Sequence, residues 1–201
     1  HRLFSKFLHP GRRVLPVGQC IETANLLLRK WPMVVEIIIF YNLMNTDKTQ
    51  TILVTGGSGF LGINMVRKLL NEGYKSIRVL DLAPFDYPEK ECITYLKGDI
   101  RDAETASKAV NGSSVVIHTA AALPLYKKED IFSTDIDGTR ILLEASEKAG
   151  TDRFIHVSST AVYGIPDHHP LFETDKLIGV GPYGKAKILA EDECLKARSK
   201  G

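Results

Sequence analysis

Cysteine and long hydrophobic runs are both scarce in this sequence of 201 residues. The three cysteines, Cys20, Cys92 and Cys194, are scattered, and their spacing fits neither a metal-binding motif nor an even-numbered disulfide framework. We interpret them as small or inert residues of a cytoplasmic protein, because thiols stay reduced in that compartment. The longest apolar segment, residues 33–43, is interrupted by polar residues and is too short to cross a bilayer, so we expect no membrane association.

A strong excess of charge of either sign is also missing. The formal net charge is +2, and residues 1–43 carry six basic against two acidic side chains. The remaining positions, 44–201, hold 20 basic and 22 acidic residues. This part therefore lacks the basic surplus typical of nucleic-acid-binding proteins, and the sequence argues against a nucleic-acid partner.

Residues 1–43 differ in character from the rest of the chain. They begin at His1, hold three prolines and follow no sustained period, and no small-residue cleavage site of a secretory signal follows them. We expect them to be a poorly ordered extension of doubtful origin, with Met44 as the natural start. Residues 44–201 are then expected to form one α/β domain.

A glycine-rich stretch dominates this domain. The β-branched run at 52–55 predicts a buried strand, which breaks into three glycines at a spacing of three and continues as an amphipathic helix that ends near Gly73. Strand, glycine turn and helix together are typical of a dinucleotide-binding site, with the pyrophosphate on the amide groups of the helix N-terminus. Glycines also mark ordinary turns, but the flanking pattern favours the dinucleotide. The residues predicted to bind it here are Gly56, Gly59, Phe60, Leu61 and Gly62.

The second predicted strand ends in Asp81, 19 positions after Gly62. An acidic residue at this place hydrogen-bonds the adenosine ribose in dinucleotide-binding domains. A carboxylate would repel a 2′-phosphate, so the predicted cofactor is NAD rather than NADP. The alternative is an ordinary solvated aspartate at the end of a strand.

Short apolar runs and amphipathic stretches alternate along the rest of the chain. This alternation predicts an α/β fold with a doubly wound parallel sheet, the Rossmann fold. A loop is expected at 83–91, and Asp102 is expected to cap the helix that ends at Val110. Strands are predicted at 77–81, 93–96, 114–118 and 153–157, and helices at 102–110, 129–148 and 182–197.

Tyr183 and Lys187 lie four residues apart on the last predicted helix and so share one face. A tyrosine hydroxyl is too weakly acidic to serve as a base at neutral pH, but a nearby ammonium favours the phenolate and lowers its pKa. The same lysine can hold a ribose hydroxyl, and Ser159 at a neighbouring strand end can orient a substrate oxygen. Such a pair alone is commonplace on helices; after a glycine fingerprint and an acidic ribose binder it becomes specific.

The spacing of the histidines does not indicate a metal site. His118 has no partner at metal-ligand spacing, and we interpret it as a histidine of the core or of a strand end. His168 and His169 lie in a proline-bearing loop without clustered cysteines or carboxylates, so a solvated loop is favoured over a metal centre.

From Thr51 onward the chain resembles the extended short-chain dehydrogenase/reductase family, the NAD-dependent epimerase/dehydratase group. The motifs that carry the resemblance are Thr-Gly-Gly-Ser-Gly-Phe-Leu-Gly at 55–62, Gly-Asp-Ile-Arg-Asp at 98–102, His-Thr-Ala-Ala at 118–121, Ser-Ser-Thr-Ala-Val-Tyr-Gly at 158–164 and Pro-Tyr-Gly-Lys-Ala-Lys at 182–187. They cover roughly three quarters of the chain.

The resemblance implies roles for further residues. Asp99 and Ile100 are expected to flank the adenine, and Ala120 and Ala121 to line the cofactor. Ser159, Tyr183 and Lys187 become the catalytic set, with Tyr183 and Lys187 also touching the cofactor. Ser159 is chosen over Ser158 because the family's hydroxyl lies four residues before the tyrosine of the Val-Tyr-Gly segment.

Three departures from the family pattern matter. An aspartate, Asp135, stands where the family usually has the asparagine of Asn-Val-x-Gly-Thr, which puts the hydrogen bond of that amide in doubt. Thr160 and Ala161 stand where the 4,6-dehydratases have an acidic pair, which argues against that reaction. The sequence stops at Gly201, before the part that supplies most of the substrate pocket in the family, so we expect little or no turnover from these 201 residues.

The function favoured by these residues is NAD-dependent hydride transfer at a secondary alcohol, as in an epimerase acting on a nucleotide sugar. Two alternatives stay open: a dehydrogenase of a 3β-hydroxysteroid or sterol-like alcohol, and a non-catalytic NAD-binding module. Family members often form homodimers through two helices, of which the helix with Tyr183 is one, so a homodimer is also open.

Overall fold

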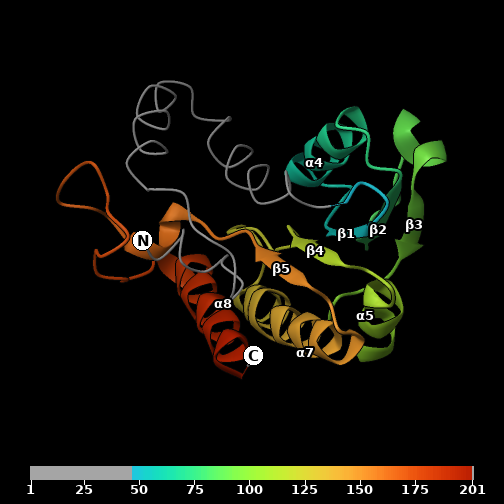
Figure 1. Ribbon diagram of the computed structural model, residues 1–201. Coiled ribbons are helices and arrows are strands. Elements are labelled where there is room, and N and C mark those ends of the chain that lie inside the picture. The colour runs from blue at the N-terminus through green and yellow to red at the C-terminus, as the bar shows by residue number, and fades with distance from the viewer. Residues whose placement is uncertain (1–46, 201) are drawn as a thin grey trace, which may run out of the picture.

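The computed structural model describes residues 47–200. The predicted extension at 1–43 therefore lies outside the described residues. The described part is a three-layered α/β structure in which helices lie on both faces of a parallel sheet (Figure 1).

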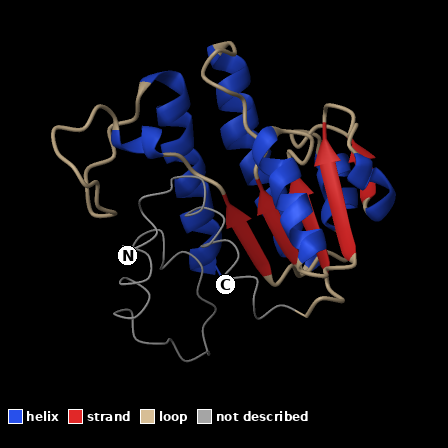
Figure 2. Ribbon diagram, turned by 90° about the horizontal axis from the view of Figure 1, so that it is seen from above, coloured by secondary structure: helices blue, strands red, loops and turns tan. Residues whose placement is uncertain are grey.

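The sheet has five parallel strands in the order β3-β2-β1-β4-β5 (Figure 1). Figure 2 shows strands of this sheet as arrows that run in the same direction, with helices on both sides. The chain runs outward from the central strand β1 to β3 and then returns to the other side of β1 with β4. Ile52 of β1 is consequently paired with Ile77 of β2 on one side and Val115 of β4 on the other. This reversal next to β1 confirms the doubly wound sheet predicted from the sequence. The strands are β1 (Thr51–Thr55), β2 (Ser76–Asp81), β3 (Thr94–Lys97), β4 (Val115–His118) and β5 (Arg153–His156).

Helix α4 lies on one face of the sheet, and α5 and α7 lie on the other (Figure 1). Helix α8 lies beside α7 and contributes its N-terminal half to the packing around α6. The helices are α4 (Phe60–Asn71), α5 (Ala103–Val110), α6 (Lys128–Phe132), α7 (Thr139–Ala149) and α8 (Gly181–Lys200), with a π-helical segment η2 (Ser133–Gly138) and 3-10 turns η1 (Pro88–Cys92) and η3 (Thr160–Tyr163).

Two apolar layers form the core because side chains of a strand alternate between the faces of the sheet. Ile52 and Val54 of β1 pack with the apolar face of α4, whereas Leu53 packs with α5 and α7. All three are fully buried. A strand buried on both faces is typical of a parallel sheet, and it explains why the run at 52–55 is apolar throughout.

Local capping signals at the helix ends are also confirmed. Asp102 accepts a hydrogen bond from the backbone N–H of Thr105, at 2.7 Å from its Oδ1, and so caps the start of α5. Gly150 ends α7 in the left-handed conformation with φ of 68°. Residues that carry a side chain rarely adopt this backbone conformation, which is why a glycine ends the helix there.

Two elements differ from the sequence predictions. The helix predicted at 129–148 is interrupted by η2, because the backbone widens to turn Asp135 inward and to seat Gly138 against Ile100. The loop predicted at 83–91 ends in η1, which starts at Pro88 and extends to Cys92; the fixed φ of proline favours a first helical position. Neither difference is visible in hydrophobic periodicity.

Among residues 47–200, no helix has the length and apolar character needed to cross a membrane.

Candidate NAD site

The candidate site lies at the carboxyl edge of the sheet, where all five parallel strands end. The loop after β1 sits beside the ends of β2 and β4, at the point where the chain reverses its direction across the sheet. Open α/β sheets bind ligands at this position because the loops on either side diverge and leave a crevice.

The three glycines of the loop make close backbone approaches. Gly56 has φ of 72°, and a Cβ there would lie 2.6 Å from the backbone N of Ala120. A Cβ on Gly62 would lie 2.1 Å from the carbonyl oxygen of Gly56. On Gly59 the nearest atom to a Cβ would be that same oxygen at 3.3 Å, so the outer side of Gly59 is open. The first and third glycines thus close the turn, and the second leaves room for a ligand against the backbone.

Helix α4 begins directly behind this turn. Its N-cap residue is Gly59, and within the described chain no side chain caps it. The first backbone N–H groups of an α-helix have no partner inside the helix, and they carry the positive end of the helix dipole. Phe60, the first residue of the helix, is 87% exposed, so its ring is not packed into the core. This end of α4 can therefore hold an anion such as a pyrophosphate.

Asp81 joins the end of β2 to the glycine turn. Its Oδ2 accepts a hydrogen bond from the backbone N–H of Ser58 at 2.8 Å, and its Oδ1 accepts from that of Ala83 at 2.9 Å. The carboxylate is thus fixed beside the turn and is more than a solvated strand-end aspartate. Each oxygen has a second acceptor position, which suits the paired hydroxyls of a ribose.

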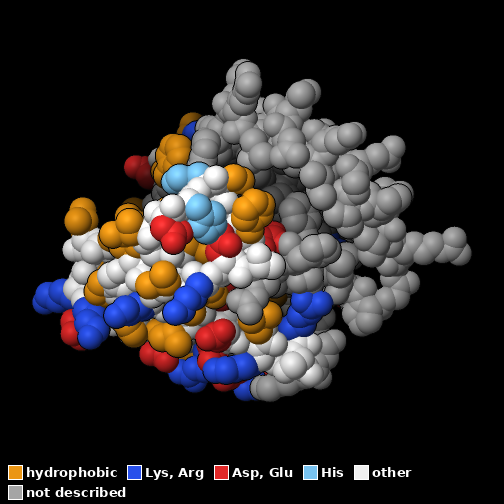
Figure 3. Space-filling view, turned by 90° about the vertical axis from the view of Figure 1, so that its left-hand side faces the viewer, with side chains coloured by type: hydrophobic (Ala, Val, Ile, Leu, Met, Phe, Trp, Pro, Cys, Tyr) orange, Lys and Arg blue, Asp and Glu red, His pale blue; other side chains and the backbone are white. Residues whose placement is uncertain are grey.

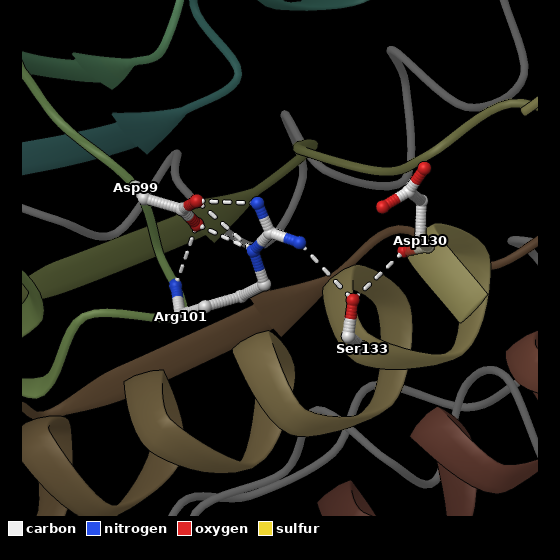
Figure 4. A network of polar contacts seen from close by, with 4 residues as sticks. All are labelled: Asp99, Arg101, Asp130 and Ser133. Carbon is white, nitrogen blue, oxygen red and sulfur yellow. Dashed lines mark hydrogen bonds and ion pairs between the residues drawn. The ribbon is translucent and has the colours of Figure 1, made fainter. Parts of the chain in front are cut away.

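Asp99 lies beyond the end of β3 and is held by Arg101 (Figure 4). The Arg101 Nε lies 3.0 and 2.9 Å from the two carboxylate oxygens, and its Nη1 donates to Ser133 at 3.1 Å. Hydrogen bonds from Arg101 lower the pKa of Asp99. The neighbouring Ile100 is buried and packs against Gly138. Asp99 is therefore an ionised acceptor, while the Ile100 side chain is core.

Ala120 and Ala121 follow β4 and are partly buried. The backbone of Ala120 lies against Gly56, and Thr119 donates from its Oγ1 to the carbonyl of Thr55 at 2.6 Å. The small residues at 120 and 121 thus follow β4 directly beside the glycine turn. The structure brings the predicted cofactor residues of β1, β2 and β4 together at one edge.

Ser159 and Ser158 follow β5 and have different partners. Ser159 accepts a hydrogen bond from the N–H of Ala161 at 3.2 Å, which caps η3, and its hydroxyl is near enough to Tyr183 to lower the pKa of that phenol. Ser158 instead donates to Glu191 of α8 at 2.6 Å. Of the two hydroxyls, Ser159 is thus the one beside the tyrosine.

Tyr183 and Lys187 lie on one face of α8, as the sequence predicts. The Lys187 side chain is 3% exposed, its Nζ donates to the carbonyl of Val157 at 3.1 Å, and it lies 5.9 Å from the centre of the Tyr183 ring. Val157 follows β5, so the ammonium lies at the carboxyl edge of the sheet, on the side of the glycine turn. Lys187 is thus near the end of β5, and Tyr183 lies within one helical turn of it.

The predicted lowering of the Tyr183 pKa is wrong for this structure. Burial is the main cause of its shift and raises the pKa of Tyr183; the hydrogen bond from Ser159 lowers it, and the negative charge of Asp135 raises it. Burial also lowers the pKa of Lys187, against the charges of Asp135, Cys194 and Glu191. The sequence shows that the two side chains are close but not how strongly the protein desolvates the phenol.

Asp135 makes its hydrogen bond as an acceptor. Its Oδ1 accepts from the backbone N–H of Ala122 at 2.7 Å, a hydrogen bond that needs only an acceptor at this position. Burial raises the pKa of Asp135, and the charge of Lys187 opposes this shift. The sequence identified Asp135 only as a departure from a pattern.

His118 is a core histidine, as predicted, and it joins a buried hydrogen-bond chain. Thr139 donates from its Oγ1 to the carbonyl of Asp135 at 2.7 Å, so it must accept from Nε2–H of His118 at 3.0 Å. The ring's Nδ1 is then an acceptor for the hydroxyl of Thr55 at 2.7 Å. This chain connects the end of β1 to the π-helical segment.

The segment between η3 and α8 carries exposed apolar side chains and two exposed histidines. Ile165, Phe172 and Ile178 expose their side chains there, and Figure 3 shows hydrophobic groups beside the exposed histidines. His168 bonds to Asp167 and Asp175, and these hydrogen bonds raise its pKa. Within the described residues, no three histidine, cysteine or acidic side chains cluster as a metal site.

Residues 52–201 match the family model described as the NAD dependent epimerase/dehydratase family. The chain belongs to that family. The family is NAD-dependent, in agreement with the cofactor that the sequence predicts. The resemblance stated from the motifs is thereby confirmed.

Two curated relatives illustrate the range of the family. The chain is 37% identical over 126 residues to a 3 beta-hydroxysteroid dehydrogenase/Delta 5-->4-isomerase of Mycobacterium tuberculosis, an alignment that covers 58% of this chain and 34% of the relative. It is 35% identical over 159 residues to a UDP-glucose 4-epimerase of Bacillus subtilis, covering 70% and 45% of the two chains.

Solved structures of the same fold carry NAD. A short-chain dehydrogenase/reductase superfamily protein from Agrobacterium tumefaciens with bound NAD matches with a TM-score of 0.70 and 31% identity, over 76% of this chain and 46% of that one. MoeE5 in complex with UDP-glucose and NAD matches with a TM-score of 0.68 and 28% identity, over 75% and 50%. The chain spans about a third to a half of the length of the curated relatives it matches.

Sequence reasoning missed the parts of the site that depend on packing. Glu191, the partner of Ser158, lies four residues after Lys187, so helical spacing alone could have placed it on the same face of α8. Thr139 could be linked to His118 only through the tertiary structure, since 21 positions separate them.

Proposed function

We propose that the protein transfers a hydride between NAD and a secondary alcohol of a nucleotide sugar, as an epimerase. Tyr183 acts as the general base and acid, and Ser159 orients the substrate oxygen. Lys187 places its positive charge beside the phenol of Tyr183. The observation that carries the proposal is the convergence of these three groups at the carboxyl edge of the sheet, beside the glycine turn.

The residues that would hold NAD come from four strand ends. The open side of Gly59 and the amides that begin α4 suit the pyrophosphate, and the fixed carboxylate of Asp81 suits the adenosine ribose. Bound NAD would supply the acceptor for the hydride of the alcohol carbon and the donor for its return. The full proposed set is Gly56, Gly59, Phe60, Leu61, Gly62, Asp81, Asp99, Ile100, Ala120, Ala121, Tyr183 and Lys187.

The chemical role of Tyr183 follows from its environment. During oxidation the phenolate form of Tyr183, reached when the phenol loses its own proton to solvent, takes the hydroxyl proton of the substrate. Ser159 orients the substrate oxygen by a hydrogen bond. Because burial raises the pKa of Tyr183, the protonated phenol is favoured once it has taken that proton. It is then ready to give the proton back when the ketone is reduced on its other face.

A 3β-hydroxysteroid or sterol-like alcohol is the second candidate substrate. It is supported by the similarity to the Mycobacterium tuberculosis dehydrogenase, as the nucleotide sugar is supported by the similarity to the Bacillus subtilis epimerase. A net rise in NADH absorbance with substrate would favour the dehydrogenase, because an epimerase returns its hydride and shows no net change.

Substitution of the catalytic pair tests the proposal. We expect Tyr183→Phe and Lys187→Met to lower turnover by about 100-fold or more, since each removes part of the proton-transfer group. Lys185→Met is the matched control, because Lys185 is exposed on the same helix and should leave turnover unchanged. Turnover is measured in the longest form of the protein that its gene encodes.

A non-catalytic NAD-binding module gives a different pattern. Its behaviour would be unaltered by Tyr183→Phe but disrupted by a substitution at Gly59. That pair of results would overturn the proposed hydride transfer while leaving NAD binding in place.

A further inference from the structure

A buried carboxylate of α8 that the proposed reaction does not use lies against the end of β5. Glu191 is 9% exposed, and its Oε1 accepts a hydrogen bond from the hydroxyl of Ser158 at 2.6 Å. This distance is typical of a hydroxyl that donates to a carboxylate, a bond about twice as strong as one between neutral groups. Since 33 positions separate the two residues, the bond ties α8 to the chain that leaves β5.

Further contacts hold α8 to the chain on either side of the two serines. Before them, the carbonyl of Val157 accepts from Nζ of Lys187 at 3.1 Å. After them, the carbonyl of Ala161 accepts from the backbone N–H of Val180 at 2.9 Å, directly before α8 begins. A Cβ on Gly184 would lie 2.5 Å from that same carbonyl oxygen, so the first turn of α8 touches η3. The backbone around the serines is therefore fixed against α8 at both ends.

The two serines are neighbours in sequence but have different partners. Successive side chains of an extended chain point in opposite directions, and Ser159 is extended, with φ of −145° and ψ of 149°. While Ser158 reaches Glu191, Ser159 caps η3 and lies near Tyr183. A slip of one residue would exchange the two hydroxyls, and two identical side chains offer no difference in size to prevent it. The partner of Ser158 must therefore decide which serine faces the tyrosine.

We propose that Glu191 is a positioning residue: by holding the hydroxyl of Ser158 it fixes the register of the two serines, so that Ser159 is the one presented to Tyr183. The inference rests on the proposed function, in which Ser159 orients the substrate oxygen, and it deepens that function by a residue outside the Ser-Tyr-Lys set. Glu191 lies four residues after Lys187 and eight after Tyr183, so all three share one face of α8.

Turnover of the longest form of the protein that its gene encodes tests the inference. We expect Glu191→Ala to lower kcat about tenfold or more, because a displaced orienting group costs rate even where binding is kept. The affinity for NAD should change less than about twofold, since the glycine turn is untouched. Glu191→Gln keeps an acceptor oxygen and should stay within about threefold of the unsubstituted chain. Asp192→Ala is the matched control, because Asp192 is exposed on the same helix.

A residue that only stabilises the fold would give a different result. Its loss would lower the unfolding temperature while kcat of the folded protein stayed the same, and that outcome for Glu191→Ala would overturn the inference. If Glu191→Ala does not fold, Ser158→Ala takes its place, with Ser158→Thr as the control that keeps a hydroxyl. An unchanged kcat in folded Ser158→Ala would then overturn the inference.

Combination with Ser159→Ala shows whether Glu191 acts through that serine. In the Ser159→Ala background, Glu191→Ala should cost no further kcat, because the hydroxyl that it positions is already gone. A further loss as large as in the unsubstituted chain would contradict the proposed role of Glu191.

The titration of Tyr183 gives a readout that needs no substrate. Tyrosine labelled with ¹³C at Cζ reports phenolate by NMR, and Tyr183→Phe identifies its signal among the seven tyrosines. Because the hydrogen bond of Ser159 lowers the pKa of Tyr183, we expect Glu191→Ala to move this titration to higher pH. At a fixed pH below the midpoint the phenolate should fall at least about threefold, whereas Glu191→Gln should leave it unchanged. An unmoved titration in folded Glu191→Ala would overturn the inference.

Failure of the inference and failure of the proposed function have different signatures. If Tyr183→Phe abolishes turnover while Glu191→Ala changes neither kcat nor the Tyr183 titration, only the role of Glu191 is lost. If Tyr183→Phe retains turnover, the proposed function fails, and the titration still reports whether Glu191 places Ser159 beside Tyr183.

Discussion

At the scale of single residues, burial decides how the polar groups of this protein behave. His118, Asp135 and Lys187 are all nearly inaccessible, yet each has a different outcome. The histidine stays neutral between two threonine hydroxyls, the lysine keeps a carbonyl partner, and the aspartate leaves one oxygen unpaired. Because desolvation always opposes the charged form, the partners decide which of these groups can carry charge.

The neutrality of His118 predicts a loss of stability in acid. Burial, and secondly the charge of Lys187, lower the pKa of His118 to about 3, whereas an unfolded histidine titrates near 6.5. Between these two values the unfolded state binds the proton and the folded state does not, so stability is present above pH 6.5 and is lost as the pH falls toward 3. The expected slope from this residue is about 1.4 kcal/mol per pH unit.

Urea denaturation at several pH values between 7.5 and 4.5 measures this slope. His118→Gln should be less stable at pH 7.5 but show a flatter dependence on pH, and His169→Gln, an exposed substitution, should behave as the unsubstituted chain. Equal slopes for His118→Gln and the unsubstituted chain would contradict the prediction.

At the scale of elements, two departures from regular secondary structure shape the candidate site: the glycine turn and the π-helical segment. The glycine turn brings the start of α4 next to the ends of β1 and β4, and the π-helical segment turns Asp135 into the core, where it accepts from Ala122. At both places the backbone departs from regular geometry. The glycine turn exposes backbone N–H groups at the carboxyl edge of the sheet, and the π-helical segment buries the Asp135 carboxylate. π-helical turns within α-helices occur frequently at functional sites, in line with this position.

The turn before α4 predicts two different effects of the same small substitution. Gly62→Ala should destabilise the protein by about 1–3 kcal/mol or more, because its Cβ would lie 2.1 Å from the carbonyl oxygen of Gly56 and only backbone movement can relieve this overlap. Gly59→Ala should destabilise the protein less than Gly62→Ala, since its Cβ would meet only that oxygen, at 3.3 Å, and a small backbone shift relieves the contact. It should instead weaken NAD binding, because the methyl group points into the open side of the turn.

Thermal denaturation and calorimetric titration with NAD separate the two effects. The two variants act as controls for each other. A Gly59→Ala chain that binds NAD as tightly as the unsubstituted chain would argue against a pyrophosphate at this turn.

At the scale of the whole molecule, the doubly wound order of the strands gathers residues distant in sequence at one edge. The loops after β1, β2 and β4 meet there because these three strands are neighbours, and α8 adds Tyr183 and Lys187 from beyond β5. A ligand that spans this edge contacts several elements at once, so its binding should stabilise the whole described structure.

Binding of NAD should therefore raise the unfolding temperature of the chain in a concentration-dependent way. A ligand that binds only the folded state adds about 2.7 kcal/mol at 100 times its dissociation constant. NADP should give a much smaller effect, because the Asp81 carboxylate repels a 2′-phosphate. Asp81→Asn should narrow the difference between the two nucleotides, whereas Asp86→Asn, an exposed control in the following loop, should keep it.

Thermal shift measurements with both nucleotides provide the readout. Equal stabilisation by NAD and NADP in the unsubstituted chain would contradict the proposal that Asp81 binds the adenosine ribose and disfavours a 2′-phosphate.

The sequence by itself determined the order of strands and helices, the glycine turn and the helical pairing of Tyr183 with Lys187. These features depend on interactions between residues a few positions apart, so apolar periodicity and glycine spacing are enough to predict them. It also identified Asp81 and Ser159, each as the polar residue at the end of a predicted strand.

Only the tertiary structure decided what those residues experience. The inward turn of Asp135, the separate partners of Ser158 and Ser159 and the threonine partners of His118 join segments up to 63 positions apart. The direction of the Tyr183 pKa could not be read from Lys187 alone, because the desolvation of the phenol depends on how α8 packs against η2 and η3. Charge and solvation are set by all the neighbours in space, and local sequence specifies only some of them.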